Sequence, residues 1–226
     1  MNLLALETST RMGSIALLSD GRLLSEFQTG IRPSYSEMLL PLIEQVLHTA
    51  GMAIRDIDLF AVAQGPGSFT ALRIGMSVMI GLAIATHKKI VTVPSLYALA
   101  YNVCGSSHLI CPMLDARRGE LYYALYRFAE GGGLQRVTPY VVAPPERILA
   151  EIDETVVLLG DGIAAYGGRF VDALGERARV APAHLLYPRA AAIGTLALQR
   201  LSDAHHDAAQ ESIMPLYVRA QDAEAK

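Results

Sequence analysis

The chain has 226 residues, of which 52% are hydrophobic and 18% are charged, and its net charge is −3. At about 150 residues per domain, this length allows one large domain or two small ones, and the apolar content excludes disorder on a large scale. The 19 basic side chains against 22 acidic ones argue against a protein that grips nucleic acid alone, because neutralising phosphates requires a basic surface.

The chain shows no sign of export or of membrane insertion. Its two cysteines, Cys104 and Cys111, belong to no metal-binding spacing, which fits a reducing cytoplasm. The start, Met1–Glu7, meets a carboxylate at once and does not resemble a secretory signal. The most apolar helical run, residues 74–85, has 12 residues, short of the roughly 18 to 20 that a membrane span needs. We expect a cytoplasmic protein.

The first half of the chain predicts three strands and then alternating helices and strands. Apolar runs separated by polar turns predict antiparallel strands at 2–7, at 14–18 and after the Asp20–Gly21 turn. A capping-box spacing between Ser34 and Glu37 begins a helix with one apolar face that ends at Gly51. We then expect a buried strand at 58–64, a helix at 70–86, a strand at 90–93 and a helix up to residue 103.

After Gly105 the pattern restarts and predicts a second, smaller unit. Its expected strands are 109–115, 120–127, 136–142 and 156–160, and its expected helices are 145–152, 163–174 and 190–201. We therefore divide the chain into an N-terminal lobe, residues 1–105, and a smaller C-terminal lobe, residues 106–226. The order of elements is repeated loosely without a residue-level repeat, so any duplication is one of architecture.

Two segments of the first half have more than one interpretation. The loop Gly65–Thr70 follows a strand and precedes a helix, where free backbone N–H groups could hold an anion, but it is equally a tight turn that starts a helix. In that helix, small residues recur at intervals of four, and apolar residues cover most of the circumference. The helix is either buried in its own fold or presents an apolar strip to another helix.

The remaining polar clusters carry weak signals. Glu7–Thr10 ends the first strand, where a carboxylate and hydroxyls could hold a phosphate or a metal-bound water, although such polar turns are common. Asp115–Glu120 is typical of a solvated hairpin with an ion pair, and Gly160–Gly162 of a turn. The six histidines lack metal-ligand spacing, His205 and His206 being adjacent, and no serine lies in a GxSxG frame. We expect no metal, no cofactor and no catalytic residue.

Several strings taken together resemble one family. LALETST, SEMLLPLIEQVL, GPGSFTALRIG, VPSLYALA, DARRGELYYALY and PLYVR match the TsaB (YeaZ) family from Leu3 to about Arg219. That family takes part in making the threonylcarbamoyl modification of tRNA adenosine beside the anticodon. The resemblance implies an α/β protein with the actin-like, sugar-kinase and Hsp70 (ASKHA) fold, built from two ribonuclease H-like lobes.

The resemblance also implies that the chain is not the catalyst. In this system TsaD transfers the threonylcarbamoyl group and holds a metal through two histidines four residues apart. Ser95 and Leu99 stand at those positions here, and neither can replace an imidazole ligand. Two residues depart from TsaB itself: Ala71 stands where the family usually has glycine, which weakens any anion site there, and Tyr35 stands where it usually has histidine.

From the family we further expect a complex with TsaD and TsaE, a homodimer when the chain is alone, and contact with tRNA mainly through these partners. The helices that contain SEMLLPL and follow GPGSFT are the expected partner surface. The residues assigned to it are Leu39, Ile43, Ala71, Gly75, Met76 and Met79. On this interpretation, a large residue at position 75 weakens the complex and leaves the monomer folded. The alternative is an enzyme in its own right, either an ATP-dependent phosphotransferase that uses Glu7, Thr8 and the Gly65 loop, or a peptidase.

Overall fold

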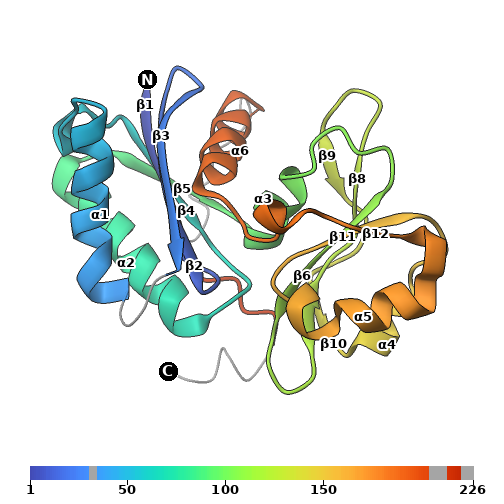
Figure 1. Cartoon of the computed structure of the whole chain (residues 1–226). Helices are drawn as coiled ribbons and strands as arrows, with labels where there is room; N and C mark the ends of the chain where they lie inside the picture. Colours follow the sequence, from blue (N-terminus) through green and yellow to red (C-terminus); the bar gives the residue numbers. More distant parts are fainter. Residues whose placement is uncertain (31–34, 204–212, 220–226) are drawn as a thin grey trace. The chain divides into compact units, whose positions relative to one another are not determined.

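The computed structural model describes residues 1–30, 35–203 and 213–219 (Figure 1). It divides the chain into two compact units, Met1–Ser95 with Arg189–Leu216, and Leu96–Pro188 with the segment that starts at Tyr217. This division differs from the predicted boundary at residue 105, because the C-terminal helix returns to the first unit. The predicted cap residue Ser34, His205 and His206, and the tail from Gln221 lie outside the described residues.

A five-stranded sheet forms the centre of the first unit. Its order is β3-β2-β1-β4-β5, with β1, β2 and β3 antiparallel and β1, β4 and β5 parallel. This is the order of a ribonuclease H-like lobe, as predicted. The strands are β1 (Asn2–Glu7), β2 (Met12–Ser19), β3 (Arg22–Gly30), β4 (Leu59–Ala63) and β5 (Lys89–Val93).

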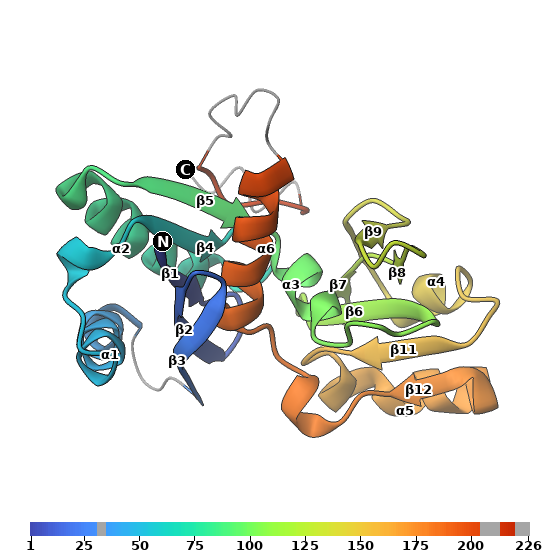
Figure 2. The same cartoon turned by 90° about the horizontal axis from the view of Figure 1, so that it is seen from above.

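Helices cover both faces of this sheet (Figures 1 and 2). On one face α1 (Tyr35–Thr49) and α2 (Phe69–Thr86) pack on alternate residues of the strands, such as Leu4 and Leu6. On the other face lies α6 (Ala190–Asp203), where a Cβ atom at Gly194 would be 2.5 Å from Leu18 Cδ1. A sheet that is buried on both faces accounts for the continuous apolar runs of its strands. The sheet covers the apolar face of α6, which contacts β1, β2 and β4.

The second unit repeats the strand order of the first. Its path is β10-β7-β6-β11-β12, with β7 antiparallel and β11 parallel to the central strand β6, and β8 pairs with β6 and β9. The predicted duplication is therefore one of topology. The strands are β6 (Leu109–Asp115), β7 (Leu121–Tyr123), β8 (Tyr126–Phe128), β9 (Leu134–Arg136), β10 (Val141–Ala143), β11 (Val156–Leu159) and β12 (Ala178–Val180).

The second unit opens with α3 (Ser95–Tyr101) and contains α4 (Pro145–Leu149) and α5 (Ile163–Leu174). Short 3₁₀ turns lie at 54–56 in the first unit and at 175–177 and 183–185 in the second. Two predicted strands, 120–127 and 136–142, are each divided in the structure. Pro139 lies in the second break and lacks the N–H that a continuous ladder requires. The core of the sheet includes Cys111, Met113 and Phe170, all fully buried.

Candidate functional site

The strand-end segment, which we define as Glu7–Thr10, is a run of four polar residues that is buried where β1 ends. Their relative exposures are between 0% and 4%. The loop at Gly65–Gly67 lies directly against this segment, since a Cβ atom at Gly67 would fall less than 3.0 Å from the carbonyl oxygen of Ser9. The N–H of Ser68 donates to the same carbonyl at 2.7 Å. The loop therefore closes onto β1 through its backbone, which only glycine permits at this distance.

Glu7 is the fully buried carboxylate of the segment. Its Oε1 accepts a hydrogen bond from the N–H of Ser9, whereas its Oε2 has no partner among the described residues. The Oγ atoms of Ser9 and Ser95 are likewise buried without a hydrogen-bond partner there. Desolvation raises the pKa of Glu7 from 4.5 to about 7, and the neighbouring Ser9 and Ser95 oppose this rise.

The segment also contacts the beginning of both covering helices. Thr8 Oγ1 donates to the carbonyl oxygen of Ala71 in α2 at 3.0 Å. The phenol of Tyr35, the first residue of α1, donates to the carbonyl oxygen of Thr10 at 2.5 Å. Burial, and after it the charge of Glu7, raises the pKa of this phenol. Tyr35 thus has a structural role in the first unit.

These contacts bear on the two interpretations of the Gly65 loop. The N–H of Ser68 and the hydroxyl of Thr8, which could otherwise face an anion, already bond within the chain. The arrangement supports a tight turn that joins β4 to α2. Across residues 1–30, 35–203 and 213–219, no group of three or more His, Cys, Asp or Glu side chains is placed to hold a metal ion. The group in this site with the most evident capacity for chemistry is the carboxyl group of Glu7, which is buried and has a pKa near neutral pH.

The other two polar clusters lie together in the second unit. Asp115 accepts a hydrogen bond from the N–H of Arg117 at 2.8 Å and pairs with its guanidinium at 3.1 Å, as a hairpin with an ion pair should. Asp161 Oδ1, in the turn after β11, accepts a hydrogen bond from the N–H of Asp115 at 3.0 Å. This cluster holds the ends of β6 and β11 in register.

The six residues predicted for a partner surface all face inward. Each is buried, and four of them belong to the core between α1, α2 and the sheet. Their relative exposures, with Gly75 buried as well, are Leu39 0%, Ile43 3%, Ala71 5%, Met76 3% and Met79 0%. A Cβ atom at Gly75 would fall less than 3.0 Å from Thr8 Oγ1, so this glycine allows α2 to approach the strand-end segment. A large residue there is expected to disturb the monomer, contrary to the interpretation from sequence.

The outward face of α2 carries other residues. Ile84 is 69% exposed, Ser77 and Gly81 are exposed, and Ile74 and Val78 are partly exposed. The helix has 18 residues with a mean hydropathy of 1.7; 33% of its residues are buried, and the others are partly or fully exposed. It exceeds the 12-residue run taken from the sequence and is long and apolar enough to cross a membrane, but its inner face packs on β4 and α1.

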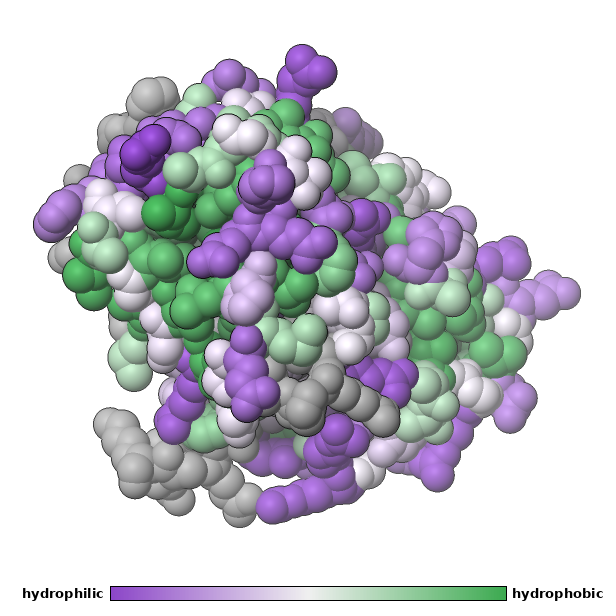
Figure 3. All heavy atoms as spheres, turned by 60° about the vertical axis from the view of Figure 1, so that its left-hand side comes forward, coloured by the Kyte–Doolittle hydropathy of each residue, from purple (hydrophilic) through white to green (hydrophobic). Residues whose placement is uncertain are grey.

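The neighbouring helix α1 also exposes an apolar side chain. Leu40 is 49% exposed on this helix, and the two helices pack against each other. Figure 3 looks toward the side of the molecule that carries α1 and α2 and shows apolar side chains grouped between charged ones. We call Leu40, Ile74, Val78, Gly81 and Ile84 the outer helix face.

The topology of the two sheets defines the chain as an actin-like α/β protein of the ASKHA class. A hexokinase of the ROK family from Thermus thermophilus shares this fold, with a TM-score of 0.52 over 90% of this chain and 100% of that one at 13% identity. At that identity the likeness concerns the fold alone.

Closer relatives give the family. The tRNA threonylcarbamoyladenosine biosynthesis protein TsaB of Bacillus subtilis is 32% identical over 100% of this chain and 97% of its own length. YeaZ from Pseudomonas aeruginosa has a TM-score of 0.80 at 32% identity, covering 96% of this chain and 99% of that one. The chain belongs to the TsaB family, which confirms the resemblance found in the sequence.

The chain is also similar in sequence to the transferase. The family model described as TsaD, tRNA N6-adenosine threonylcarbamoyltransferase, matches residues 18–226. A protein of that name from Trichlorobacter lovleyi is 28% identical over 84% of this chain but only 58% of its own length. The chain thus shares part of the transferase's sequence and is shorter than this relative.

Proposed function

We propose that this chain acts in the formation of threonylcarbamoyladenosine in tRNA as a non-catalytic partner of the transferase TsaD. One observation carries the proposal: α2 is an apolar helix whose outer side is left exposed by its own chain at Gly81, Ile84 and Ala85. An exposed apolar surface of this kind in a protein of this composition is typical of a protein–protein contact. The outer helix face is the proposed contact surface.

The region around Ser95 supports a partner without its own catalytic metal. Ser95 and Leu99, which stand where the transferase pattern has histidines, lie on α3 and are 0% exposed. The hydroxyl of a buried serine and an aliphatic side chain offer no soft nitrogen ligand. Metal chemistry is therefore assigned to TsaD, and TsaE and tRNA are assigned to the assembled complex, which we place in the cytoplasm.

The outer helix face suits a partner that presents an apolar helix of its own. Gly81 has nothing within 4 Å of a Cβ atom built on it, so another helix can approach its backbone closely. Arg73 is exposed one turn before Ser77 and lies over the ring of Phe69 with its guanidinium carbon 3.8 Å from the centroid. Apolar side chains with few charges favour burial, because a contact that excludes water there leaves few ions to desolvate. In the absence of TsaD, we propose that a second copy of the chain occupies the same face.

A substitution on the outer helix face tests the proposal. Ile84→Glu introduces a charge at a position that is 69% exposed, so the monomer is expected to keep its stability. Binding to TsaD, measured by calorimetry, should weaken by tenfold or more, and tRNA modification by the reconstituted proteins should fall in parallel. The matched control is Val171→Glu on α5, at a position 42% exposed in the second unit. Undiminished binding by the Ile84 variant would overturn the proposed surface.

A measurement of nucleotide binding distinguishes the proposed partner function from the alternative, an enzyme in its own right. The buried polar segment at the end of β1 is the feature that would serve an ATP-dependent reaction. Titration of the isolated chain with ATP and magnesium should give no heat of binding if the chain is a partner only. Tight binding, together with product formation when TsaD is omitted, would favour the enzyme.

A further inference from the structure

The strand-end segment is the common attachment of the two helices that carry the outer helix face. Tyr35 attaches the first turn of α1 to the carbonyl oxygen of Thr10 at 2.5 Å. Thr8 attaches the first turn of α2 to it at 3.0 Å through the carbonyl oxygen of Ala71. The N–H of Ser68, just before α2, bonds to the carbonyl oxygen of Ser9 at 2.7 Å. A shift of this four-residue turn would therefore reach both helices at once.

Glu7 lies at the base of that turn and is incompletely bonded. Its Oε1 holds the N–H of Ser9, and its Oε2 is fully buried without a hydrogen-bond partner in the described part of the chain. The hydroxyls of Ser9 and Ser95 lie beside it and favour its charged form, but less than burial disfavours that form. A buried carboxylate with so few donors is costly, whereas a protonated carboxyl group carries no charge and has an O–H of its own to donate.

Among the residues that the structure describes, the groups that face Glu7 bring no positive charge to neutralise it. From α1 the Tyr35 phenol faces it, and this group is neutral when protonated. From β2 its register partner is Ser14, which bonds to Glu26 at 3.2 Å. Glu26 is already paired with the guanidinium of Arg189. From α3 and the turn itself come the hydroxyls of Ser95 and Ser9.

We propose that a proton on Glu7 keeps the strand-end segment closed on α1 and α2, so that loss of this proton loosens the first turns of both helices. When the proton leaves to solvent, Oε2 becomes a buried anion, and the turn must open toward water or redirect its hydroxyls. Opening of the turn separates Thr10 from Tyr35 and Thr8 from Ala71. The rise of the Glu7 pKa to about 7 supports loss of this proton near neutral pH. The part of the inference that concerns pairing rests on the proposed function.

Amide hydrogen exchange on the isolated full-length chain tests the coupling without any partner. If the closed segment binds the proton with a pKa of about 7 and the open one with the ordinary value of 4.5, opening becomes about tenfold more frequent between pH 6 and pH 8.5. After correction for chemical exchange, protection should fall by that factor in the amides that donate to the first-turn carbonyl groups of α1 and α2, and in the amide of Ser68, which bonds to Ser9. In Glu7→Gln it should not change with pH, and in Glu44→Gln, on the exposed side of α1, it should fall as in the wild type.

A second variant covers the case in which Glu7→Gln folds poorly. Tyr35→Phe keeps the ring and removes the hydroxyl that bonds to Thr10. It should lower protection, at both pH values, of the amides that donate to the first-turn carbonyl groups of α1, and leave the pH response in α2. Protection that is independent of pH in the wild type, or an equal pH response in a folded Glu7→Gln protein, would overturn the inference. The same holds if Tyr35→Phe leaves α1 unaffected.

Pairing provides the second arm of the experiment. Affinity for TsaD, measured from pH 6 to pH 8.5, should decline with the same midpoint in the wild type and stay flat in Glu7→Gln. If exchange responds to pH as expected but no affinity for TsaD is found at any pH, the proposed function fails and the coupling of Glu7 to the helices stands. If both proteins bind but neither exchange nor affinity depends on Glu7, the coupling fails and the proposed function stands.

Discussion

Gly75→Ala tests how closely α2 approaches the end of β1. The new methyl group would lie less than 3.0 Å from Thr8 Oγ1, 3.0 Å from Thr8 Cγ2 and 3.2 Å from Thr8 Cβ. Thr8 cannot turn away freely, because it is fully buried and its hydroxyl bonds to Ala71 at 3.0 Å. The helix must therefore move away from the strand, or Thr8 must give up its hydrogen bond.

The expected cost follows from three terms. Overpacking a filled interior costs about 1 to 3 kcal/mol, and loss of the Thr8 hydrogen bond adds about 1 kcal/mol. Alanine favours the helix over glycine by about 1 kcal/mol, which offsets part of this cost. The free energy of unfolding should therefore fall by about 1 to 3 kcal/mol. Gly81→Ala on the exposed side of the same helix has nothing within 4 Å of its Cβ atom, so it should gain up to about 1 kcal/mol.

Urea unfolding followed by circular dichroism measures both variants, since the chain has no tryptophan for fluorescence. A double-mutant cycle with Thr8→Ala identifies the contact. Removal of the Thr8 side chain makes room for the methyl group, so Gly75→Ala should cost at least about 1 kcal/mol less in that background. If Gly75→Ala is as stable as the wild type, or if the two changes are additive, the contact between α2 and Thr8 does not carry the energy assigned to it.

Three further predictions concern other buried groups. Glu26→Gln should lower stability by about 2 to 4 kcal/mol in urea unfolding, because the Glu26 carboxylate pairs with Arg189 and accepts the N–H of Ala191 at 3.0 Å at the start of α6. The pKa of Glu7 is higher in the folded state, about 7 against 4.5, so the wild type should lose about 3 kcal/mol relative to Glu7→Gln as pH rises through this interval. Gly160→Ala should cost about 3 kcal/mol or more, since φ is +116° and a Cβ atom would meet the carbonyl oxygen of β6, while Gly168→Ala, with open space around it, should not.

The sequence predicted most elements, because burial on both faces of a sheet leaves continuous apolar runs that are easily recognised. The helix 163–174 begins and ends where the pattern placed it. β12 was not predicted, since its three residues include Arg179 and two of them are exposed. The return of α6 to the first unit could not be predicted either. Periodicity shows that a helix has an apolar face and does not show which sheet covers that face.

The candidate site, like the fold, could be predicted from the sequence only in part. Glu7–Thr10 could be selected as polar residues at a strand end, but their burial and their bonds to α1 and α2 depend on contacts far apart in sequence. The orientation of α2 was not predictable, because apolar residues surround nearly its whole circumference. A helix with little polar surface gives no pattern from which its inner side can be read. The small residues that suggested a partner contact divide accordingly, Gly75 toward β1 and Gly81 toward the outer helix face.

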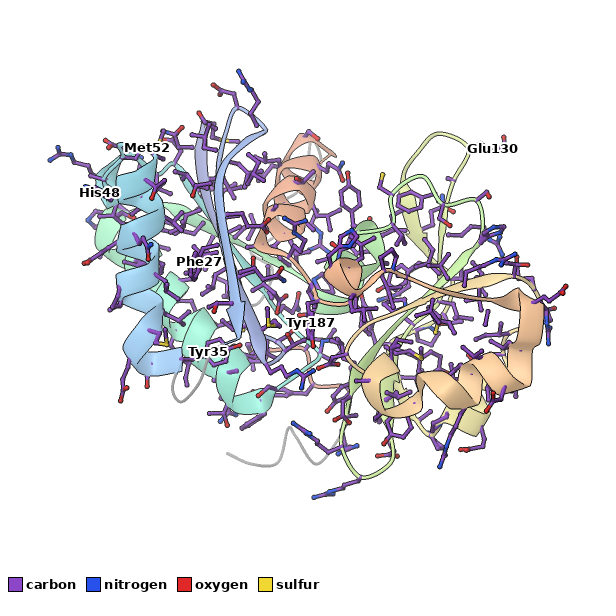
Figure 4. The ribbon with its side chains drawn as sticks, viewed as in Figure 1. Phe27, Tyr35, His48, Met52, Glu130 and Tyr187 are labelled. Atoms are coloured by element: carbon purple, nitrogen blue, oxygen red, sulfur yellow. The ribbon has the colours of Figure 1, made fainter. Side chains whose placement is uncertain are left out.

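The two units share one topology but carry different side chains where the central strand of each sheet ends. In each, a glycine loop after the strand parallel to the central one approaches that central strand closely, Gly67 at Ser9 and Gly160 at Met113. In the second unit the carboxylate that ends the central strand, Asp115, accepts the N–H of Arg117 and pairs with its guanidinium, and Asp161 bonds to the N–H of Asp115. In the first unit the carboxylate that ends the central strand, Glu7, is buried, and one of its oxygens has no hydrogen-bond partner among the described residues. Buried polar groups without a hydrogen-bond partner are rare in folded proteins. The difference between the two junctions is therefore the strongest reason to seek the regulation of this chain at Glu7 (Figure 4 shows Tyr35, which attaches α1 to the same turn).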